Sequence, residues 1–374
     1  MILVLNSGSS TVKYRLVDPA DPAAGRGGVV ERIGEPGGAR DHTAAVQEIF
    51  DDLSSAPEPI VAVGHRVVHG GSRFVQPTRL DDAAVAAIGE LTPLAPLHNP
   101  GALAGIEAAR RVLDAVPHVA VFDTAFHADL PAAAATYALD SSLAAEHGIR
   151  RYGFHGISHE YVAGRAAHLL GRPPADVNLV VLHLGNGASA CAVAGGRSVE
   201  TSMGMTPLEG LVMGTRSGDL DPAIPGFLRR TGMADADVED LLQHRSGLAG
   251  LCGVNDMRTV LARRADGDAA ATLALDVYCH RIRKYVGAYH AVLGRLDAVV
   301  FTAGIGEHAP PVRSLSLAGL DAFGIAVDPD RNEGGSGERL ISADGARVAV
   351  CVVPTDEEFA IARAVRELTD SPAG

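Results

Sequence analysis

The stretch ILVLNSGSSTVKYRLVD, residues 2–18, decides the fold of this chain. An apolar run meets a glycine- and serine-rich turn and continues into alternating apolar and polar residues, a pattern that predicts a β-hairpin. A second hairpin is predicted for NLVVLHLGNGASACAVAGGRSVETS, residues 178–202, around a glycine turn. Both stretches run from an apolar strand through a polar residue and one spacer to small turn residues. We interpret them as a weak internal repeat, with one copy in each of two domains.

The rest of the chain alternates predicted strands with predicted helices. We expect strands at residues 60–68, 118–126, 297–304 and 348–354, and helices at 81–91, 101–114, 158–170, 268–294 and 355–368. Residues 19–40 are rich in Pro, Gly and Ala and predict a loose connection or turns. A chain of 374 residues exceeds one ordinary core. The mixture predicts α/β layers, with a cleft between the two halves that carry the hairpins.

The composition excludes several classes of protein. The formal charge is −13, which argues against a nucleic-acid partner because a phosphate backbone needs a basic surface. The four cysteines show no CxxC spacing, so neither a zinc site nor a disulfide framework is predicted. The N-terminus lacks the pattern of a signal peptide, and no run approaches the roughly 18 apolar residues of a membrane span. We therefore expect a cytoplasmic protein without a membrane partner.

Three glycine-rich turns follow apolar strands and are candidates for holding phosphates. They lie at residues 6–11, 183–187 and 304–306. Glycine and serine let backbone N–H groups approach a polyphosphate closely. One such turn alone would be interpreted as an ordinary tight turn. Three of them, each after an apolar strand, favour a nucleotide-binding site. The chain has no GxxxxGK[ST] motif and is not a P-loop protein. Lys13, one of only two lysines, stands beside the first turn and suits a phosphate oxygen.

Two arginines are candidates for holding an anion. Arg66 lies in the apolar strand VGHRVV, and Arg216 lies in the polar loop GTRSGDLDP. The alternatives are a surface position on an edge strand for Arg66 and an ordinary loop arginine for Arg216. If both face the cleft, they form a clamp for anionic oxygens. Such a clamp suits a carboxylate acceptor, which is ionised at pH 7 and needs no base, better than a sugar hydroxyl.

Three further residues are candidates for the site: Asp123, His155 and Glu357. Asp123 closes an apolar strand, where α/β proteins place ligands, although it is also suited to capping a turn. His155 is followed by a glycine, which indicates a close approach to another group. Thr355 and Glu358 form the pattern of a capping box at the last helix. Glu357 has no such duty, so it is a candidate ligand for Mg²⁺.

The motifs resemble those of the acetate kinases. The matching blocks are LNSGSSTVK, GHRVVHGG, APLHNP, FDTAFH, RYGFHGISH, HLGNGAS, GMTPLEGLVMGTRSGD, NDMR, FTAGIGE and PTDEEF, in the family's order from residue 5 to residue 359. The resemblance implies two duplicated actin-like (ribonuclease H-like) domains. The first would comprise residues 1–127 with a closing helix at 359–374, and the second, residues 128–358, would carry the nucleotide site. It also implies a homodimer and Mg²⁺-dependent transfer between ATP and acetate, with ADP and acetyl phosphate as products and Mn²⁺ as an alternative ion.

The resemblance also implies roles for individual residues. Catalytic roles fall to Asp123, His155 and Arg216, and metal binding to Asn6 and Glu357. Acetate would be bound by Arg66, with its methyl group among Val68, Leu97, Phe154 and Pro207. The nucleotide would be bound by Lys13, His183, Leu184, Gly185, Asn186, Gly187, Asp256, Met257, Arg258, Gly304, Ile305, Gly306, Glu307 and His308. The expected mechanism is direct in-line transfer, in which the protein positions the reactants and stabilises charge.

Some positions depart from the family pattern, and other functions compete with this one. His308 stands where asparagine is usual, and the run before Asp256 is one residue shorter. The nearest alternative is a propionate or butyrate kinase, which would need smaller residues around the acyl chain. A sugar kinase of the same fold would need acidic and amide side chains at the acceptor. A non-catalytic nucleotide switch would have lost one of the key residues, and none is lost.

Overall fold

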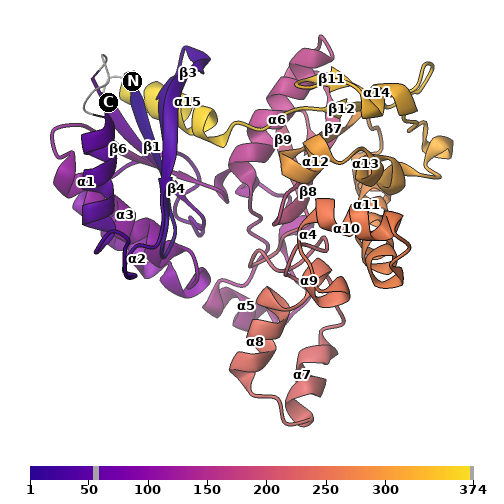
Figure 1. The fold of residues 1–374 in the computed structure, drawn as a ribbon, viewed down its shortest axis with the longest axis horizontal. Helices are drawn as coiled ribbons and strands as arrows, with labels where there is room; N and C mark the ends of the chain where they lie inside the picture. Colours follow the sequence, from indigo (N-terminus) through magenta and orange to yellow (C-terminus); the bar gives the residue numbers. More distant parts are fainter. Residues whose placement is uncertain (54–58, 371–374) are drawn as a thin grey trace. The chain divides into compact units, whose positions relative to one another are not determined.

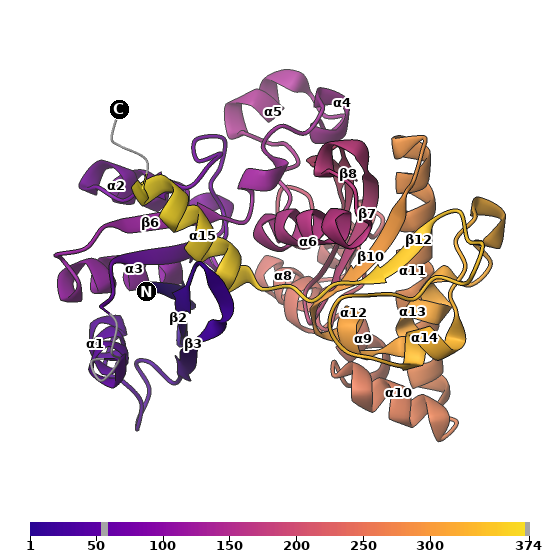
Figure 2. The same ribbon diagram turned by 90° about the horizontal axis from the view of Figure 1, so that it is seen from above.

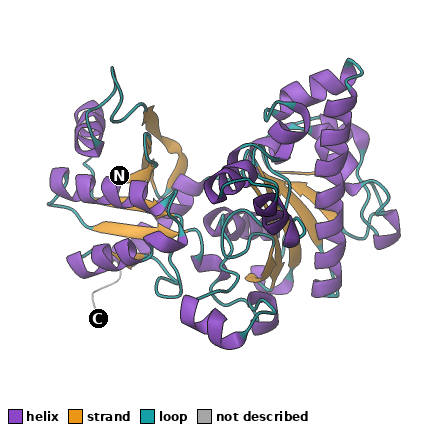
Figure 3. Ribbon diagram, turned by 90° about the horizontal axis from the view of Figure 1, so that it is seen from below, coloured by secondary structure: helices purple, strands orange, loops and turns teal. Residues whose placement is uncertain are grey.

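The computed structural model describes residues 1–53 and 59–370, which form two compact units (Figure 1). Unit 1 comprises Met1–Ala128, Phe154–Ser158 and Asp356–Gly374, and unit 2 comprises Asp129–Gly153 and His159–Thr355. Each unit is built on one six-stranded mixed sheet. Figure 3 shows the helices of each unit on both sides of its strands. Residues 371–374, the end of the predicted closing helix, lie outside the described residues.

The sheet of unit 1 has the order β3-β2-β1-β4-β6-β5. Its strands are β1 (Ile2–Ser7), β2 (Val12–Asp18), β3 (Asp21–Val30), β4 (Ala62–Val67), β5 (Thr78–Arg79) and β6 (His118–Phe122). The first three strands are antiparallel, as the predicted hairpin requires. Strands β1, β4 and β6 run parallel to one another, and β5 is antiparallel to β6.

The sheet of unit 2 repeats this arrangement, with the order β9-β8-β7-β10-β12-β11. Its strands are β7 (Asn178–Leu184), β8 (Ala188–Ala194), β9 (Arg197–Thr201), β10 (Ala298–Thr302), β11 (Arg339–Leu340) and β12 (Ala349–Val352). Here too an antiparallel hairpin leads into two parallel strands and an antiparallel edge strand. The internal repeat and the α/β fold with two duplicated actin-like domains, both predicted from the sequence, are confirmed.

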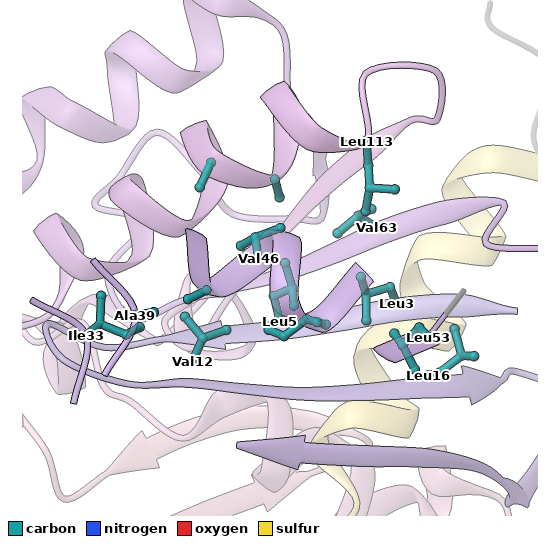
Figure 4. Packing of buried hydrophobic residues seen from close by; sticks show 14 residues of the cluster. Leu3, Leu5, Val12, Leu16, Ile33, Ala39, Val46, Leu53, Val63 and Leu113 are labelled. Atoms are coloured by element: carbon teal, nitrogen blue, oxygen red, sulfur yellow. The ribbon is translucent and has the colours of Figure 1, made fainter. Parts of the chain in front are cut away.

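Side-chain alternation along the strands divides the first sheet into two faces. On one face Leu3, Leu5 and Val63 belong to a buried cluster with residues of α1 (His42–Leu53) and α3 (Asn99–Val112), shown in Figure 4. On the other face, a Cβ on Gly64 of β4 would meet side chains of Ile361 and Val365 from α15 (Glu357–Asp370) at 2.7 and 2.9 Å. Glycine therefore lets α15 approach the sheet closely, and Figure 2 shows this helix (yellow) lying over the strands of unit 1.

The remaining helix of unit 1 is α2 (Asp82–Glu90), which packs beside α3. The helices of unit 2 are α4 (Ala132–Ala135), α5 (Ser141–His147), α6 (Gly156–Leu169, beginning in unit 1), α7 (Ala223–Arg230), α8 (Asp235–His244), α9 (Gly247–Cys252), α10 (Met257–Ala265), α11 (Ala269–Leu293), α12 (Ala303–His308), α13 (Pro310–Leu317) and α14 (Pro329–Glu333). The long α11 packs against β8 and β7.

Two local predictions were wrong. Residues 19–40 were expected to be a loose connection or turns. Turns do occur at residues 33–34 and 36–37, but residues 21–30 form β3, which pairs with the whole length of β2. The backbone ladder of β2 stabilises this glycine-rich strand in spite of its weak β-propensity. Residues 304–306 were expected to be a loop before a helix, but they lie within α12, because the helix begins directly after β10.

The four cysteines are all buried, and none forms a disulfide bond. Among residues 1–53 and 59–370, no helix is both long and apolar enough to cross a membrane.

Candidate active site

The carboxyl edge of the first sheet gathers three of the predicted site residues. Asn6 lies near the end of β1, Arg66 near the end of β4, and Asp123 directly after β6. Because these strands are parallel, their carboxyl ends meet at one edge, where α/β proteins bind ligands. Alternation from Val4 and Gly64 places Asn6 and Arg66 on the face covered by α15. Lys13 is exposed and pairs directly with Asn6 across the hairpin.

Arg66 and Asp123 form a two-bond ion pair on this face. Nε of Arg66 donates to Oδ1 of Asp123 at 2.9 Å, and Nη2 donates to Oδ2 at 2.7 Å. Asp123 is 1% exposed. Strand β4 lies between β1 and β6, so the alternative of an exposed arginine on an edge strand is wrong. Burial alone would lower the pKa of Arg66, but the carboxylates of Asp123 and Glu357 outweigh it and raise that pKa.

Glu357 brings a second carboxylate to the same arginine. Its Oε2 lies 3.5 Å from Nη1 of Arg66. Burial raises the pKa of Glu357; Arg66 opposes this rise, the negative charge of Asp123 adds to it, and Lys13 opposes it. A buried carboxylate, that of Asp123, and a partly buried one, that of Glu357, therefore share one guanidinium, so the cluster has more carboxylates than guanidinium groups.

The start of α15 places Glu357, and the predicted capping box is wrong. The helix begins at Glu357, and the carboxylate of Asp356 accepts from the backbone N–H of Phe359 at 3.0 Å. Arg15 holds the same carboxylate at 2.6 Å. Thr355, expected as the cap, instead donates its backbone N–H to Glu307 at 3.4 Å. The helix thus starts one residue later than the Thr355 pattern predicted, and Glu357 occupies its first position.

His155 lies in a turn that is joined to Asp123 through the backbone. The backbone N–H of Gly156 donates to the carbonyl of Asp123 at 2.8 Å, and a Cβ at Gly156 would lie 2.2 Å from that oxygen. This is the close approach that the glycine indicated. His155 itself has φ of +57°, a strained value for a residue with a Cβ. Such strain is concentrated at functional sites.

A buried histidine, His127, also supports the turn formed by Phe154 and His155. Nε2 of His127 donates to the carbonyl of Phe154 at 3.1 Å, since a carbonyl can only accept. Burial lowers the pKa of His127 to about 4, with the Phe154 carbonyl and Asp123 opposing the shift. The ring of Phe154 meets the ring of His69 edge-on at 5.4 Å. His127 is therefore a neutral support for the Phe154–His155 turn.

The four residues predicted around the acetate methyl group do not share one unit. Val68, Leu97 and Phe154 belong to unit 1, and Pro207 belongs to unit 2. Phe154 is fully buried, Val68 is partly buried, and Leu97 is 52% exposed in the loop before α3.

Sequence reasoning missed the residue that holds the Val68 turn. The side chain of Asn99 accepts from the N–H of His69 at 3.2 Å and donates to the His69 carbonyl at 3.1 Å. Within the block APLHNP, the buried polar residue is Asn99. The signal was an asparagine placed just before Pro-Gly at a helix start.

Arg216 lies in the long segment between β9 and α7 in unit 2. Its Nη1 donates to the carbonyl of Pro207 at 2.8 Å and contacts Sδ of Met213 at 3.6 Å. Burial lowers the pKa of Arg216. Within the described part of the chain, no carboxylate forms an ion pair with this guanidinium. It is a mostly buried cation whose charge an incoming anion would neutralise.

A cavity of about 450 Å³ in unit 2 collects most of the predicted nucleotide residues. Those that line it are Gly185, Asn186, Asp256, Met257, Arg258, Gly304, Ile305 and His308. Those that do not line it are His183, Leu184, Gly187, Gly306 and Glu307, and Lys13 belongs to unit 1. The cavity adds three residues that were not predicted: Asn255, Leu261 and Ala309.

Asp256 organises one wall of this cavity. It caps α10 by accepting from the N–H of Arg258 at 2.8 Å and of Thr259 at 3.3 Å. The Arg258 guanidinium also bonds this carboxylate, which lowers the pKa of Asp256 to about 2. Arg258 and His308 are 93% and 79% exposed at their side chains and lie at the cavity wall.

The predicted Mg²⁺ ligands do not form a cage of protein side chains among the described residues. The described residues contain no group of three or more His, Cys, Asp or Glu side chains suited to a metal ion. Asn6 and Glu357, the predicted ligands, both belong to unit 1.

The sequence matches the Acetokinase family over residues 1–363. An acetate kinase of Clavibacter michiganensis subsp. michiganensis is 58% identical, with 97% of this chain and 98% of that protein covered. The crystal structure of Porphyromonas gingivalis acetate kinase superposes with a TM-score of 0.94 at 40% identity, covering 99% of each chain. A propionate kinase from Francisella tularensis subsp. tularensis gives a TM-score of 0.92 at 39% identity, covering 98% of this chain and 99% of that one.

Proposed function

The chain belongs to the acetokinase family, and we propose that it is an acetate kinase, which transfers a phosphoryl group reversibly between ATP and acetate. The observation that carries the proposal is the pair of partly buried arginines with opposite surroundings. Arg66 is fixed by two carboxylates, whereas Arg216 bonds only a carbonyl and a sulfur atom. Arg66 offers a cationic group suited to an anionic acceptor, and Arg216 offers one suited to a transferred phosphoryl group.

Arg66 is assigned to the acetate carboxylate. A guanidinium has five N–H groups in a planar fork. Asp123 bonds Nε and Nη2 of Arg66, and Glu357 lies 3.5 Å from Nη1; the remaining N–H groups of Nη1 and Nη2 are proposed to bind the acetate carboxylate. Asp123 then acts by orienting Arg66 rather than as a base, since a carboxylate acceptor has no proton to lose.

Arg216 and His155 are assigned to the transition state. Phosphoryl transfer spreads negative charge over the equatorial oxygens of the moving group, and catalysis depends on positioning and charge stabilisation. A buried guanidinium without a carboxylate partner gains most from such an anion. The strained turn fixes the backbone of His155 against Asp123. The chemistry is a direct in-line transfer in which the acetate oxygen attacks the γ-phosphorus and ADP leaves.

Mg²⁺ is assigned to Asn6 and Glu357. The ion is commonly bound by one or two carboxylates together with water and substrate phosphates, so it requires no cage of protein ligands. The two carboxylates around Arg66 fit a divalent cation. When bound, the ion would neutralise charge on the phosphates, and Mn²⁺ would be accepted by the same oxygen ligands.

The cavity of unit 2 is assigned to ATP and ADP. Its wall combines glycines, which permit a close approach, with the apolar side chains of Met257, Leu261 and Ile305. The strand and helix ends beside the cavity carry further residues proposed to bind the nucleotide: His183, Leu184, Gly187, Gly306 and Glu307. Lys13 is proposed to contact a phosphate. We further propose residues 1–127 with 359–374, and residues 128–358, as the functional domains of a cytoplasmic homodimer.

A propionate kinase is the second candidate, favoured by the similarity to the Francisella tularensis protein. Four residues are proposed to limit the length of the acyl chain: Val68, Leu97, Phe154 and Pro207. One methylene in an apolar pocket changes discrimination by about 1–3 kcal/mol. Propionate is therefore expected as a slower substrate even of an acetate kinase.

The proposal is tested by Mg²⁺-dependent turnover of ATP with acetate, propionate, butyrate and glucose as separate acceptors. Hydroxylamine traps any acyl phosphate as a hydroxamate. The expected result is the highest kcat/KM with acetate, a lower value with propionate and none with glucose. A higher value with propionate favours the second candidate, and phosphorylation of glucose alone contradicts both.

A further inference from the structure

The segment between β9 and α7 contains both Pro207 and Arg216 and has no helix or strand of its own. Its position must therefore come from side chains and turns. Two residues nine positions apart in the sequence, Gly210 and Asp219, close it into a loop. The N–H of Gly210 donates to Oδ1 of Asp219 at 2.9 Å, and the N–H of Asp219 donates to the carbonyl of Gly210 at 3.0 Å.

This closure is fastened to the long helix α11. The hydroxyl of Tyr285 donates to Oδ2 of Asp219 at 2.9 Å. Nη1 of Arg281 donates to the carbonyl of Gly210 at 3.0 Å and to that of Asp219 at 3.2 Å, and lies 3.4 Å from Oδ2 of Asp219. We call Gly210, Asp219, Arg281 and Tyr285 the Asp219 clasp. Both ends of the loop are thus tied to one rigid helix that packs on the sheet of unit 2.

The interior of the loop leaves Arg216 little freedom. Its backbone carbonyl accepts from the N–H of Met213 at 3.2 Å, and its side chain bonds Pro207. At Gly218, φ is +66° and a Cβ would lie 2.4 Å from the carbonyl of Leu211. The chain can turn back from Arg216 to Asp219 in this way only because residue 218 is glycine. The path between the clasp and the guanidinium is therefore short and tightly packed.

We propose that the Asp219 clasp is a positioning device for Arg216, which sets the place of its guanidinium in the phosphoryl-transfer step. The inference rests on the proposed function, because it takes Arg216 as a group that stabilises the transition state. The clasp residues are proposed not to touch substrate but to act on Arg216 through the loop that contains it. Burial, followed by the charge and the hydrogen bond of Asp219, raises the pKa of Tyr285, so its hydroxyl remains a donor at neutral pH.

The chemistry of the clasp predicts a graded series of variants. Asp219→Ala removes both carboxylate oxygens, and with them the bonds to Gly210 and Tyr285 and the charge beside Arg281; the two backbone carbonyls that Arg281 bonds remain. Asp219→Asn keeps an acceptor for Gly210 but loses the charge beside Arg281. Tyr285→Phe removes one hydrogen bond and keeps the ring. A displacement of about 1 Å in a catalytic group costs about 100-fold in rate, so kcat should fall most in the first variant and least in the third.

The decisive experiment is a double-mutant cycle on the full-length enzyme between Asp219→Ala and Arg216→Ala. For Asp219→Ala we expect kcat to fall about 100-fold while the KM values for acetate and ATP change less than about threefold. If the clasp acts through Arg216, adding Asp219→Ala to Arg216→Ala should cost no more than about threefold further. Hydrogen exchange in residues 210–219 should be faster in Asp219→Ala than in the wild type.

A matched control separates positioning from general stability. Asp328→Ala removes another capping carboxylate of unit 2, which accepts from the N–H of Arg331 at 2.9 Å, away from the clasp. It should lower Tm without lowering kcat. The role proposed for the clasp would be contradicted if the losses in kcat of the two single variants multiplied in the double variant. It would also be contradicted if kcat fell no more in Asp219→Ala than in Asp328→Ala. Neither result would contradict the proposed function. A wild-type enzyme that does not phosphorylate acetate would overturn both proposals.

Discussion

The guanidinium of Arg66 lies against the carboxylate of Asp123 in a two-bond pair of 2.9 and 2.7 Å, and this pair joins β4 to the end of β6. Glu357 approaches the same guanidinium at 3.5 Å from the first turn of α15. One cation thus faces two anions contributed by separate parts of the chain. Replacing any one of these three residues therefore changes the electrostatic surroundings of the other two.

Arg66→Ala should raise the KM for acetate at least about tenfold and change the KM for ATP by less than about threefold, because it removes the only fork proposed to bind the acceptor. It should also destabilise unit 1 by about 3–5 kcal/mol, since the carboxylates of Asp123 and Glu357 lose their partner. Initial rates at varied acetate and a thermal unfolding curve measure the two effects. Arg66→Lys is the matched variant, because it keeps the charge without the fork. An unchanged KM for acetate in both variants would contradict the assignment.

Glu357→Gln should raise the Mg²⁺ concentration for half-maximal activity by about 10–100-fold, as expected when a metal-binding carboxylate is lost. Glu358→Gln is the control, because Glu358 does not form the capping box that the sequence suggested. The measurement is a titration of activity with Mg²⁺ at saturating substrates. Equal shifts in the two variants would remove Glu357 from the metal site.

His127 should make unit 1 sensitive to acid. Its pKa is lowered from 6.5 to about 4 in the folded protein. The folded state therefore binds this proton less readily than the unfolded chain. The stability due to neutral His127 is present above pH 6.5 and is lost as pH falls from there towards 4, by about 3 kcal/mol in total.

The measurement for His127 is the free energy of unfolding between pH 7 and pH 4 for the wild type and His127→Gln. Glutamine keeps an N–H donor for the Phe154 carbonyl but does not titrate. The variant should show a shallower decline of stability with acid. Parallel curves for the two proteins would show that His127 is not the titrating group.

His308→Asn should change the relative KM values for ATP and GTP, because His308 lines the cavity proposed for the nucleotide. Since its side chain is mostly exposed, the effect on affinity should be modest, about two- to tenfold. Kinetics with each nucleotide at saturating acetate provide the measurement. The KM for acetate serves as the internal control and should stay constant.

Much of the fold was predictable because the local patterns agree with the final structure. The hairpins of β1–β2 and β7–β8 combine apolar strands with glycine-rich turns, and the parallel strands are nearly continuous apolar runs. The placement of Arg66 and Asp123 at strand ends followed from the same patterns. Strand β3 was missed because its glycines and alanines carry no strand signal; its partner strand determines its conformation.

The long-range pairs could not be predicted. Asp219 and Tyr285 are 66 residues apart, and Arg66 and Glu357 come from opposite ends of the chain. No periodicity encodes such pairs, because they depend on how the sheets order their strands. The cap of α15 was misplaced by one residue, as Thr355 and Asp356 both suit that role and only the contact with Arg15 favours Asp356.

The position of α15 has a consequence for biosynthesis. This helix follows β1, β4 and β6 in the chain, so it is made after the strands that its Ile361 and Val365 cover at Gly64. Until residues 357–370 have been made, the nascent sheet of β1, β4 and β6 lacks this cover, and Arg66 lacks the carboxylate of Glu357. A chain that stops before residue 357 should therefore aggregate more readily than one that includes α15, because this apolar face stays exposed.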